Sequence, residues 1–165
     1  MGAGPQHLSL APLSNMEAVI LIGIQAVGKS TFFSRRFADT HVRINLDMLR
    51  TRHRERILLE ACIAAKQPFV VDNTNATVAE RAKYIELARA ARFRVVGYYF
   101  QSKLSDALER NRQRAVPKAI PEKGVAATLS RLQIPSLAEG FDELHYVTLS
   151  GPGEFSVQEW RDGLR

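Results

Sequence analysis

An unbroken apolar run followed by a glycine-flanked loop constrains this chain more than any other stretch. Residues 18–22 are apolar and rich in β-branched side chains, as expected for a strand that is buried on both faces. The next residues, 23–30, read Gly-Ile-Gln-Ala-Val-Gly-Lys-Ser and fit the phosphate-binding pattern G-x-x-x-x-G-K-[ST]. Apolar positions then recur at helical spacing. A strand, a loop of this kind and a helix, in this order, predict a nucleoside triphosphate site.

The positions of this loop have distinct physical roles. Glycine at 23 and 28 lets the backbone turn its N–H groups inward onto a phosphate. Lys29 is expected to reach the β- and γ-phosphates, and the Ser30 hydroxyl is expected to bind Mg²⁺. The start of the helix adds its positive dipole end. We therefore assign ATP to Gly23, Gln25, Ala26, Val27, Gly28, Lys29, Ser30 and Thr31.

Composition sets broader limits. Residues 1–15 are rich in Gly, Pro, Ser and Ala, which predicts a disordered tail. The length of 165 residues predicts a single domain at 16–165. The net charge of +6 favours an anionic partner only weakly, since a solvated basic surface explains it equally well. The single Cys62 excludes an internal disulfide and fits a reducing compartment. With no Lys or Arg before Lys29 and no apolar run of membrane-spanning length, we expect a cytoplasmic protein with no membrane partner.

Strands and helices alternate along the rest of the chain. We expect strands at 18–22, 41–45, 69–71, 93–100 and 146–149, and helices at 29–37, 48–66, 78–92, 104–114, 125–132 and 157–164. Thr77, with Glu80 three residues later, is expected to cap the third of these helices. In the helix at 48–66, the predicted core residues are Leu49, Ile57, Leu58, Cys62 and Ile63. The alternation predicts an α/β fold, a P-loop NTPase-type parallel sheet with helices on both faces.

Polar clusters follow two of the predicted strands, at the carboxyl ends where ligands bind in such a sheet. The first contains Asp47 and Arg50, which are three residues apart and would share a face of one helical turn. A kinase needs a carboxylate that accepts the proton of the attacking hydroxyl, although Asp47 is also a good helix cap. The second is Asp72-Asn73-Thr74-Asn75, where Asp72 would support Mg²⁺. The alternative for this stretch is a turn built from its Asn side chains.

The sequence also contains two clusters of basic residues. Arg110 and Arg114 are four residues apart and face one way, so that a forked guanidinium could stabilise a transferring phosphoryl group. The Pro-flanked segment after them predicts a mobile lid, which makes the fold kinase-like with a basic lid. The second cluster is Arg50, Arg52, His53, Arg54 and Arg56. It would receive the phosphates of a nucleic-acid strand, or it is the outer face of an ordinary helix.

Taken together, these pieces resemble the 5′-kinase domain of polynucleotide kinases, both the phage enzyme and the animal polynucleotide kinase-phosphatase. The matching pieces, in the family's order, lie at 23–31, 43–47, 71–75, 81–84, 110–111 and 137–141. The resemblance implies transfer of the ATP γ-phosphate to a 5′-hydroxyl end of DNA or RNA.

The resemblance also implies roles for individual residues. Asp47 would be the general base, and Arg114 would be the lid arginine that acts with Lys29 on the transferring phosphate. The acceptor would contact Arg50, Asp72, Asn73 and Asn75, the nucleotide would also contact Arg110, and Mg²⁺ would be held by Ser30 and Asp72. The implied partner is a single-stranded or end-exposed nucleic acid with a 5′-hydroxyl.

The chain departs from the family at Leu46, where relatives often have Arg, and this affects the expected acceptor contacts. A chain of 165 residues is too short for the phosphatase half of some relatives, so we expect any 3′-end activity to be absent or supplied elsewhere. Two other functions stay open at this point. One is a P-loop kinase of a small hydroxyl-bearing metabolite, and the other is a nucleotide-binding module without transfer activity.

Overall fold

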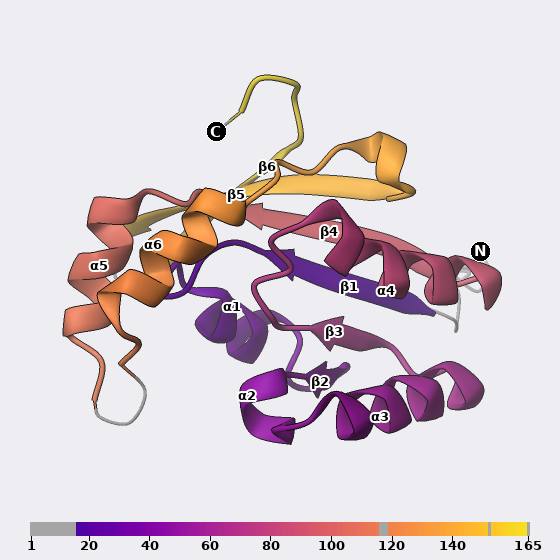
Figure 1. Ribbon diagram of the computed structural model, residues 1–165. Coiled ribbons are helices and arrows are strands. Elements are labelled where there is room, and N and C mark those ends of the chain that lie inside the picture. The colour runs from indigo at the N-terminus through magenta and orange to yellow at the C-terminus, as the bar shows by residue number, and fades with distance from the viewer. Residues whose placement is uncertain (1–15, 116–118, 152, 165) are drawn as a thin grey trace, which may run out of the picture.

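A six-stranded sheet forms the centre of the molecule (Figure 1). The computed structural model describes residues 16–115, 119–151 and 153–164, and the predicted disordered tail lies outside the described residues. In spatial order the strands are β2 (Val42–Ile44), β3 (Phe69–Val71), β1 (Glu17–Ile22), β4 (Arg94–Phe100), β5 (Glu143–Gly151) and β6 (Glu154–Glu159). In this spatial order, all neighbouring strands from β2 to β5 are parallel to one another. Strand β6 is antiparallel to β5. The predicted α/β parallel sheet is confirmed, with one antiparallel edge strand added.

Helices cover both faces of this sheet. Because successive side chains of a strand point to opposite faces, β1 contributes Ala18, Ile20 and Ile22 to one core and Val19 and Leu21 to the other. The first core includes side chains of α3 (Arg52–Ala65) and α4 (Val78–Ala90). The second includes side chains of α1 (Lys29–Arg36), α5 (Leu104–Arg112) and α6 (Glu122–Arg131). In the described parts of the chain, no helix has the length and apolarity needed to cross a bilayer.

The helix predicted at 48–66 is wrong as a single element. The chain forms a one-turn helix, α2 (Leu46–Leu49), which ends at Arg50 with a positive φ of 72°. Helix α3 then begins after Thr51, whose hydroxyl accepts a hydrogen bond from the Arg54 N–H. Of the predicted core residues, Cys62 lies in the core and Leu49, Leu58 and Ile63 pack against it, whereas Ile57 lies on the outer side of α3 and is 52% exposed.

The closing helix predicted at 157–164 is also wrong. Residues 154–159 form strand β6, in which Phe155 and Val157 pack against the core while Ser156 and Gln158 are exposed. The alternation of side chains has the two-residue period of a strand. The strand predicted at 146–149 is longer in the structure, where it is β5 and pairs with β6. The turn between the two strands contains Gly153, whose φ is 71°.

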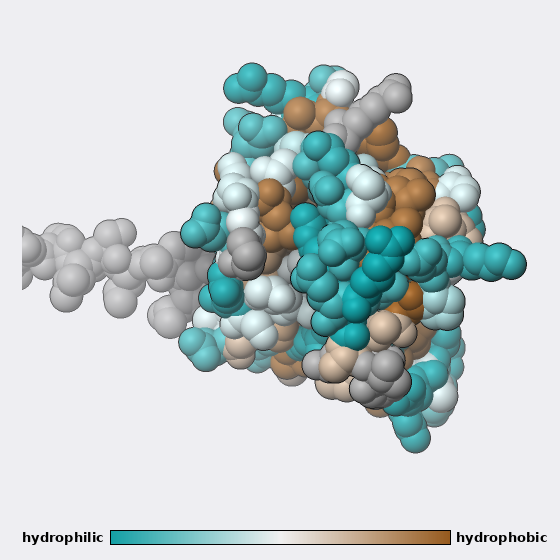
Figure 2. Space-filling model, turned by 90° about the vertical axis from the view of Figure 1, so that its left-hand side faces the viewer, coloured by the Kyte–Doolittle hydropathy of each residue, from teal (hydrophilic) through white to brown (hydrophobic). Residues whose placement is uncertain are grey.

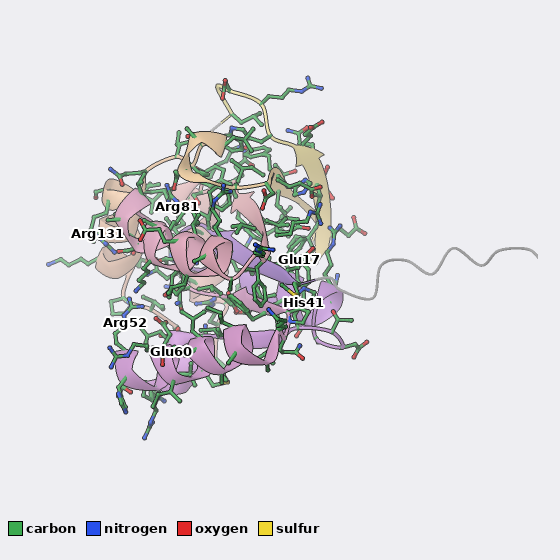
Figure 3. All side chains as sticks on the ribbon, turned by 90° about the vertical axis from the view of Figure 1, so that its right-hand side faces the viewer. Glu17, His41, Arg52, Glu60, Arg81 and Arg131 are labelled. Carbon is green, nitrogen blue, oxygen red and sulfur yellow. The ribbon has the colours of Figure 1, made fainter. Side chains whose placement is uncertain are left out.

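A buried ion pair fixes the turn after β3. Arg81, on α4, is fully buried and forms two hydrogen bonds with the carboxylate of Glu139 in the short helix η1 (Leu137–Glu139), at 2.8 and 3.1 Å. The same guanidinium donates to the carbonyls of Asn75 and Ala76, at 2.9 and 3.2 Å. Figure 3 labels Arg81 on α4 and Arg52 on α3, the two helices that cover this face of the sheet. The pair therefore anchors the loop that carries Asp72.

Replacing Glu139 with Gln should lower the free energy of unfolding by about 3 kcal/mol, because the buried Arg81 would lose the charge that compensates it. Urea denaturation measures this difference. The matched control is Glu109→Gln, which breaks an exposed ion pair with Arg112 and should cost less than about 0.5 kcal/mol. A loss below about 1 kcal/mol for Glu139→Gln would contradict the assigned role of the pair.

Candidate active site

The phosphate-binding loop lies at the end of the sheet toward which β1, β3 and β4 point, beside α5 and α6 (Figure 1). The Gly23 N–H donates to the Thr74 carbonyl at 3.0 Å, which ties the loop to the turn after β3. Gly28 has a left-handed φ of 98° and is the N-cap of α1. The start of this helix therefore faces the open space between the loop and the neighbouring strand ends.

Lys29 is buried, and its ammonium is held by the loop itself. Its Nζ donates to the carbonyls of Gly23 and Ile24, at 2.7 and 2.6 Å. Burial lowers the pKa of Lys29 to about 8; Asp72 and Asp47 oppose this change, whereas Arg114 adds to it. The charges of these three residues therefore lie close enough to Lys29 to change its pKa.

A second cluster joins Ser30, Asp72 and Arg43. The Ser30 hydroxyl donates to Oδ2 of the buried Asp72 at 3.1 Å. The Arg43 guanidinium donates to the same Oδ2 through Nε, at 2.8 Å, and to the Ser30 hydroxyl, at 2.9 Å. Sequence reasoning missed Arg43 as a site residue. The available signal was its position in β2, two residues before Asn45, on the strand that leads to Asp47.

The oxygen atoms of Ser30 and Asp72 fit Mg²⁺, which prefers hard oxygen ligands and is often bound by one or two carboxylates together with nucleotide phosphates. Among the described residues, no group of three or more His, Cys, Asp or Glu side chains could hold a metal alone. A metal at this position would therefore depend on the phosphates of a bound nucleotide.

Asp47 lies on the one-turn helix α2, which is positioned by two asparagines. The Asn45 side chain accepts from the Met48 N–H at 2.9 Å, and Asn73 Oδ1 accepts from the Leu46 N–H at 2.8 Å. Asp47 itself is exposed, and no other described residue forms a hydrogen bond or ion pair with its carboxylate. The carboxylate is thus available to a ligand. Arg50 ends the helix and does not line the cavity that Asp47 lines.

A buried polar network supports Asn73 from behind. Asn73 Nδ2 donates to Glu55 at 3.1 Å, and the Tyr84 hydroxyl donates to the other Glu55 oxygen at 2.9 Å. Burial and the Glu55 carboxylate raise the pKa of Tyr84, so the hydroxyl stays protonated as a donor. Asn75 is also buried and donates to the Leu21 carbonyl at 2.7 Å. Both asparagines, assigned to the acceptor from the sequence, face protein groups and shape the loop.

Helices α5 and α6 contact the phosphate loop directly. Gln25 Nε2 donates to the Thr128 hydroxyl of α6 at 2.9 Å, and Arg110 of α5 donates to the Ala26 carbonyl at 3.4 Å. Arg114 lines the same cavity as Lys29 and Asp47. Hydrophilic side chains gather in the middle of this face of the molecule (Figure 2). The segment that follows, where a mobile lid was predicted, includes residues 116–118, which lie outside the described residues.

Two cavities flank the start of α1. The smaller, about 70 Å³, is lined by Gln25, Ala26, Lys29, Ser30, Asn45, Asp47, Asp72, Thr74, Arg114 and Ile120. The larger, about 540 Å³, is lined by Gly28, Thr31, Asp106, Arg110, Gln113, Leu149, Ser150, Gly151, Gly153 and Phe155. The residues assigned to ATP from the sequence divide between them, except Val27, which is buried in the core, and Gly23, whose N–H is committed to Thr74.

Comparison with known proteins shows the family to which the chain belongs. The family model described as an AAA domain matches residues 19–135. The bifunctional polynucleotide phosphatase/kinase of Schizosaccharomyces pombe is 30% identical over 150 residues, which cover 87% of this chain. The chain spans 36% of the length of that relative.

Solved structures share the fold at lower identity. A gluconokinase from Sinorhizobium meliloti 1021 has a TM-score of 0.60 and 19% identity, over 83% of this chain and 85% of that protein. Kti12 from Chaetomium thermophilum, in complex with ADP-AlF3, has a TM-score of 0.59 and 16% identity, over 81% and 89% of the two chains. The P-loop kinase fold expected from the sequence is therefore confirmed.

The lowered pKa of Lys29 predicts how nucleotide affinity depends on pH. Between pH 7.5 and pH 9, a lysine with a pKa of about 8 goes from mostly charged to about one-tenth charged, while the phosphates of ADP stay ionised. Because the phosphates bind the charged form, ADP affinity should fall about tenfold over this interval. Isothermal titration calorimetry measures this change. Lys29→Met should bind weakly and without this pH dependence, and equal affinity of the native protein at both pH values would contradict the prediction.

Ala26 predicts a stabilising substitution. It has a φ of 62°, a left-handed conformation that is strained for a residue with a Cβ atom. Ala26→Gly should therefore raise the free energy of unfolding by about 1 kcal/mol, as measured by urea denaturation. The control is Ala61→Gly, at an exposed position of α3. There the same substitution should lower the free energy of unfolding by about 1 kcal/mol, because glycine disfavours a helix. A loss of stability at position 26 would contradict this account of the loop.

Proposed function

Because the chain belongs to the AAA domain family, with a P-loop domain of the kinase type, we propose that it is an ATP-dependent kinase. The acceptor that we propose is the 5′-hydroxyl end of a DNA or RNA strand. One observation carries the proposal: Asp47, Lys29 and Arg114 line the same cavity at the start of α1. A carboxylate and two cationic side chains are the groups that phosphoryl transfer to a hydroxyl needs.

Each of these groups has a role in the proposed reaction. The Asp47 carboxylate accepts the proton of the attacking hydroxyl, as its exposure and lack of a described partner allow. Lys29 exchanges the loop carbonyls for the phosphates, and Arg114 stabilises the charge on the transferring group. Ser30 and Asp72 would hold Mg²⁺, which, when bound, neutralises charge on the β- and γ-phosphates.

The two cavities suggest how ATP divides between them. A volume of about 70 Å³ accommodates only a small group, whereas about 540 Å³ falls in the size range of nucleotide and drug-like ligand sites. We assign the terminal phosphates to the smaller cavity and the nucleoside to the larger one. Phe155 offers the nucleoside an aromatic ring, and Arg110 offers it a guanidinium plane.

Two observations favour a polynucleotide as the acceptor. The S. pombe relative is named a polynucleotide phosphatase/kinase, and we transfer only the kinase activity, since the chain spans 36% of that protein. In addition, Arg50, Arg52, His53, Arg54 and Arg56 are all exposed in the segment that follows Asp47. A cationic surface beside the proposed base suits the phosphates of a strand end, and its affinity for the strand would fall steeply with salt.

Replacing Asp47 with Asn should lower kcat by at least about a hundredfold, because the amide cannot accept the proton. The measurement is transfer of label from γ-labelled ATP to a 5′-hydroxyl oligonucleotide in the presence of Mg²⁺. The dissociation constant for ADP should stay within about threefold of the native value, since the Lys29 ammonium donates its hydrogen bonds to loop carbonyls and not to Asp47.

The matched control is Asp39→Asn, an exposed carboxylate in the turn after α1, which should leave transfer unchanged. Retained turnover in Asp47→Asn would remove that residue from the mechanism. Label on a small hydroxyl compound but on no oligonucleotide would replace the acceptor class with a metabolite. Tight ATP binding without transfer to any acceptor would indicate that the protein is a nucleotide-binding module without kinase activity.

A further inference from the structure

Arg43 lies beside the buried carboxylate of Asp72 and neutralises its charge. Its Nε and one terminal nitrogen lie 2.8 and 2.7 Å from the same carboxylate oxygen, and that terminal nitrogen lies 2.9 Å from the Ser30 hydroxyl. The Asp72 side chain is 2% exposed, so its charge requires a cation close by. The guanidinium also lies over the Phe33 ring, 5.7 Å from its centre.

The oxygen atoms that Arg43 contacts are the ones that we assigned to Mg²⁺. A magnesium ion lies about 2.0–2.1 Å from its ligands, so an ion on Ser30 Oγ and Asp72 Oδ2 would lie within a few ångströms of the guanidinium. At such a distance, two cations in a partly buried site repel each other by several kcal/mol. Arg43 and a metal therefore compete for these oxygens.

We propose that Arg43 is the resident counter-cation of the metal site and sets the concentration of divalent cation that the protein needs. The inference rests on the proposed function, which assigns Ser30 and Asp72 to the metal. In the nucleotide-free protein, Arg43 compensates the Asp72 charge. When the metal and nucleotide bind, the guanidinium leaves Asp72, and its 29% exposed side chain has a direct route to solvent.

A purely structural ion pair predicts a different result. If Arg43 stayed on Asp72 with the metal bound, its removal would destabilise the free and the loaded protein equally and would not improve metal binding. Competition instead predicts that removing Arg43 destabilises the free protein more than the loaded protein. It also predicts tighter binding of the metal, because no internal cation has to be displaced.

The experiment titrates Mn²⁺, a spectroscopic probe for the magnesium position, into the protein at saturating ADP and follows free Mn²⁺ by electron paramagnetic resonance. Arg43→Gln should lower the half-saturating Mn²⁺ concentration about tenfold. The same variant should unfold at a lower temperature without ligand and should show a larger thermal shift on addition of Mn²⁺ and ADP. Arg36→Gln is the matched control, since Arg36 is a cation over the Phe32 and Tyr98 rings on the same helix as Ser30. It should leave the half-saturating concentration unchanged.

Arg43→Lys keeps the charge but loses the forked donors, and should lower the half-saturating concentration about threefold. This milder variant decides the question if Arg43→Gln does not fold. An unchanged or higher half-saturating concentration would overturn the inference while leaving the kinase proposal intact. If the native protein binds no Mn²⁺ with ADP, the proposed metal site and this inference both fail.

Discussion

The buried carboxylate of Asp72 is the interaction on which the rest of the site depends. It stands at the end of β3, which lies between β1 and β2 in the sheet, and it contacts Ser30 of the phosphate loop and Arg43 of β2. Its charge also opposes the effect of burial on the pKa of Lys29. A carboxylate this deeply buried is stable only among donors and cations, so the fold must bring these partners to it. The described side chains of the site therefore compensate one another's charges.

The same internal compensation extends to the lysine and to the helices beside the loop. The Lys29 ammonium donates hydrogen bonds to loop carbonyls. Gln25 and Arg110 connect the loop to α6 and α5. Asn111 exchanges hydrogen bonds with both backbone groups of Ile120, which closes the base of the segment that joins the two helices. Of these donors, Lys29 and Gln25 line the smaller cavity and Arg110 lines the larger one. The arrangement pre-positions the donors at a low cost of rearrangement.

Local signals were sufficient for most of the fold. The apolar run of β1, the spacing of glycines and Lys29, and the Thr77 cap of α4 each act through near neighbours in the chain, and the structure contains all of them. The break between α2 and α3 was predictable in part, since Thr51 is a good cap. However, helical periodicity continued across Arg50, and only its positive φ reveals the interruption. Strand β6 was not predictable locally, because its short apolar alternation needs the edge of β5 and the Phe32 ring to become favourable.

For the site, the sequence by itself determined the phosphate loop, Lys29, Ser30 and the candidate carboxylates, because these depend on residue type and spacing along one strand, loop and helix. Only the tertiary structure decided which polar residues reach the cavity and which hold it together. Asn73 and Asn75 were grouped with Asp72 in sequence, yet their amides bind protein groups from other elements. The position of Arg43 in β2 did not identify its partner, yet parallel pairing of β2 with β3 brings it to Asp72. The physical reason is that compensation of a buried charge depends on distance in space, which the order of residues along the chain does not specify.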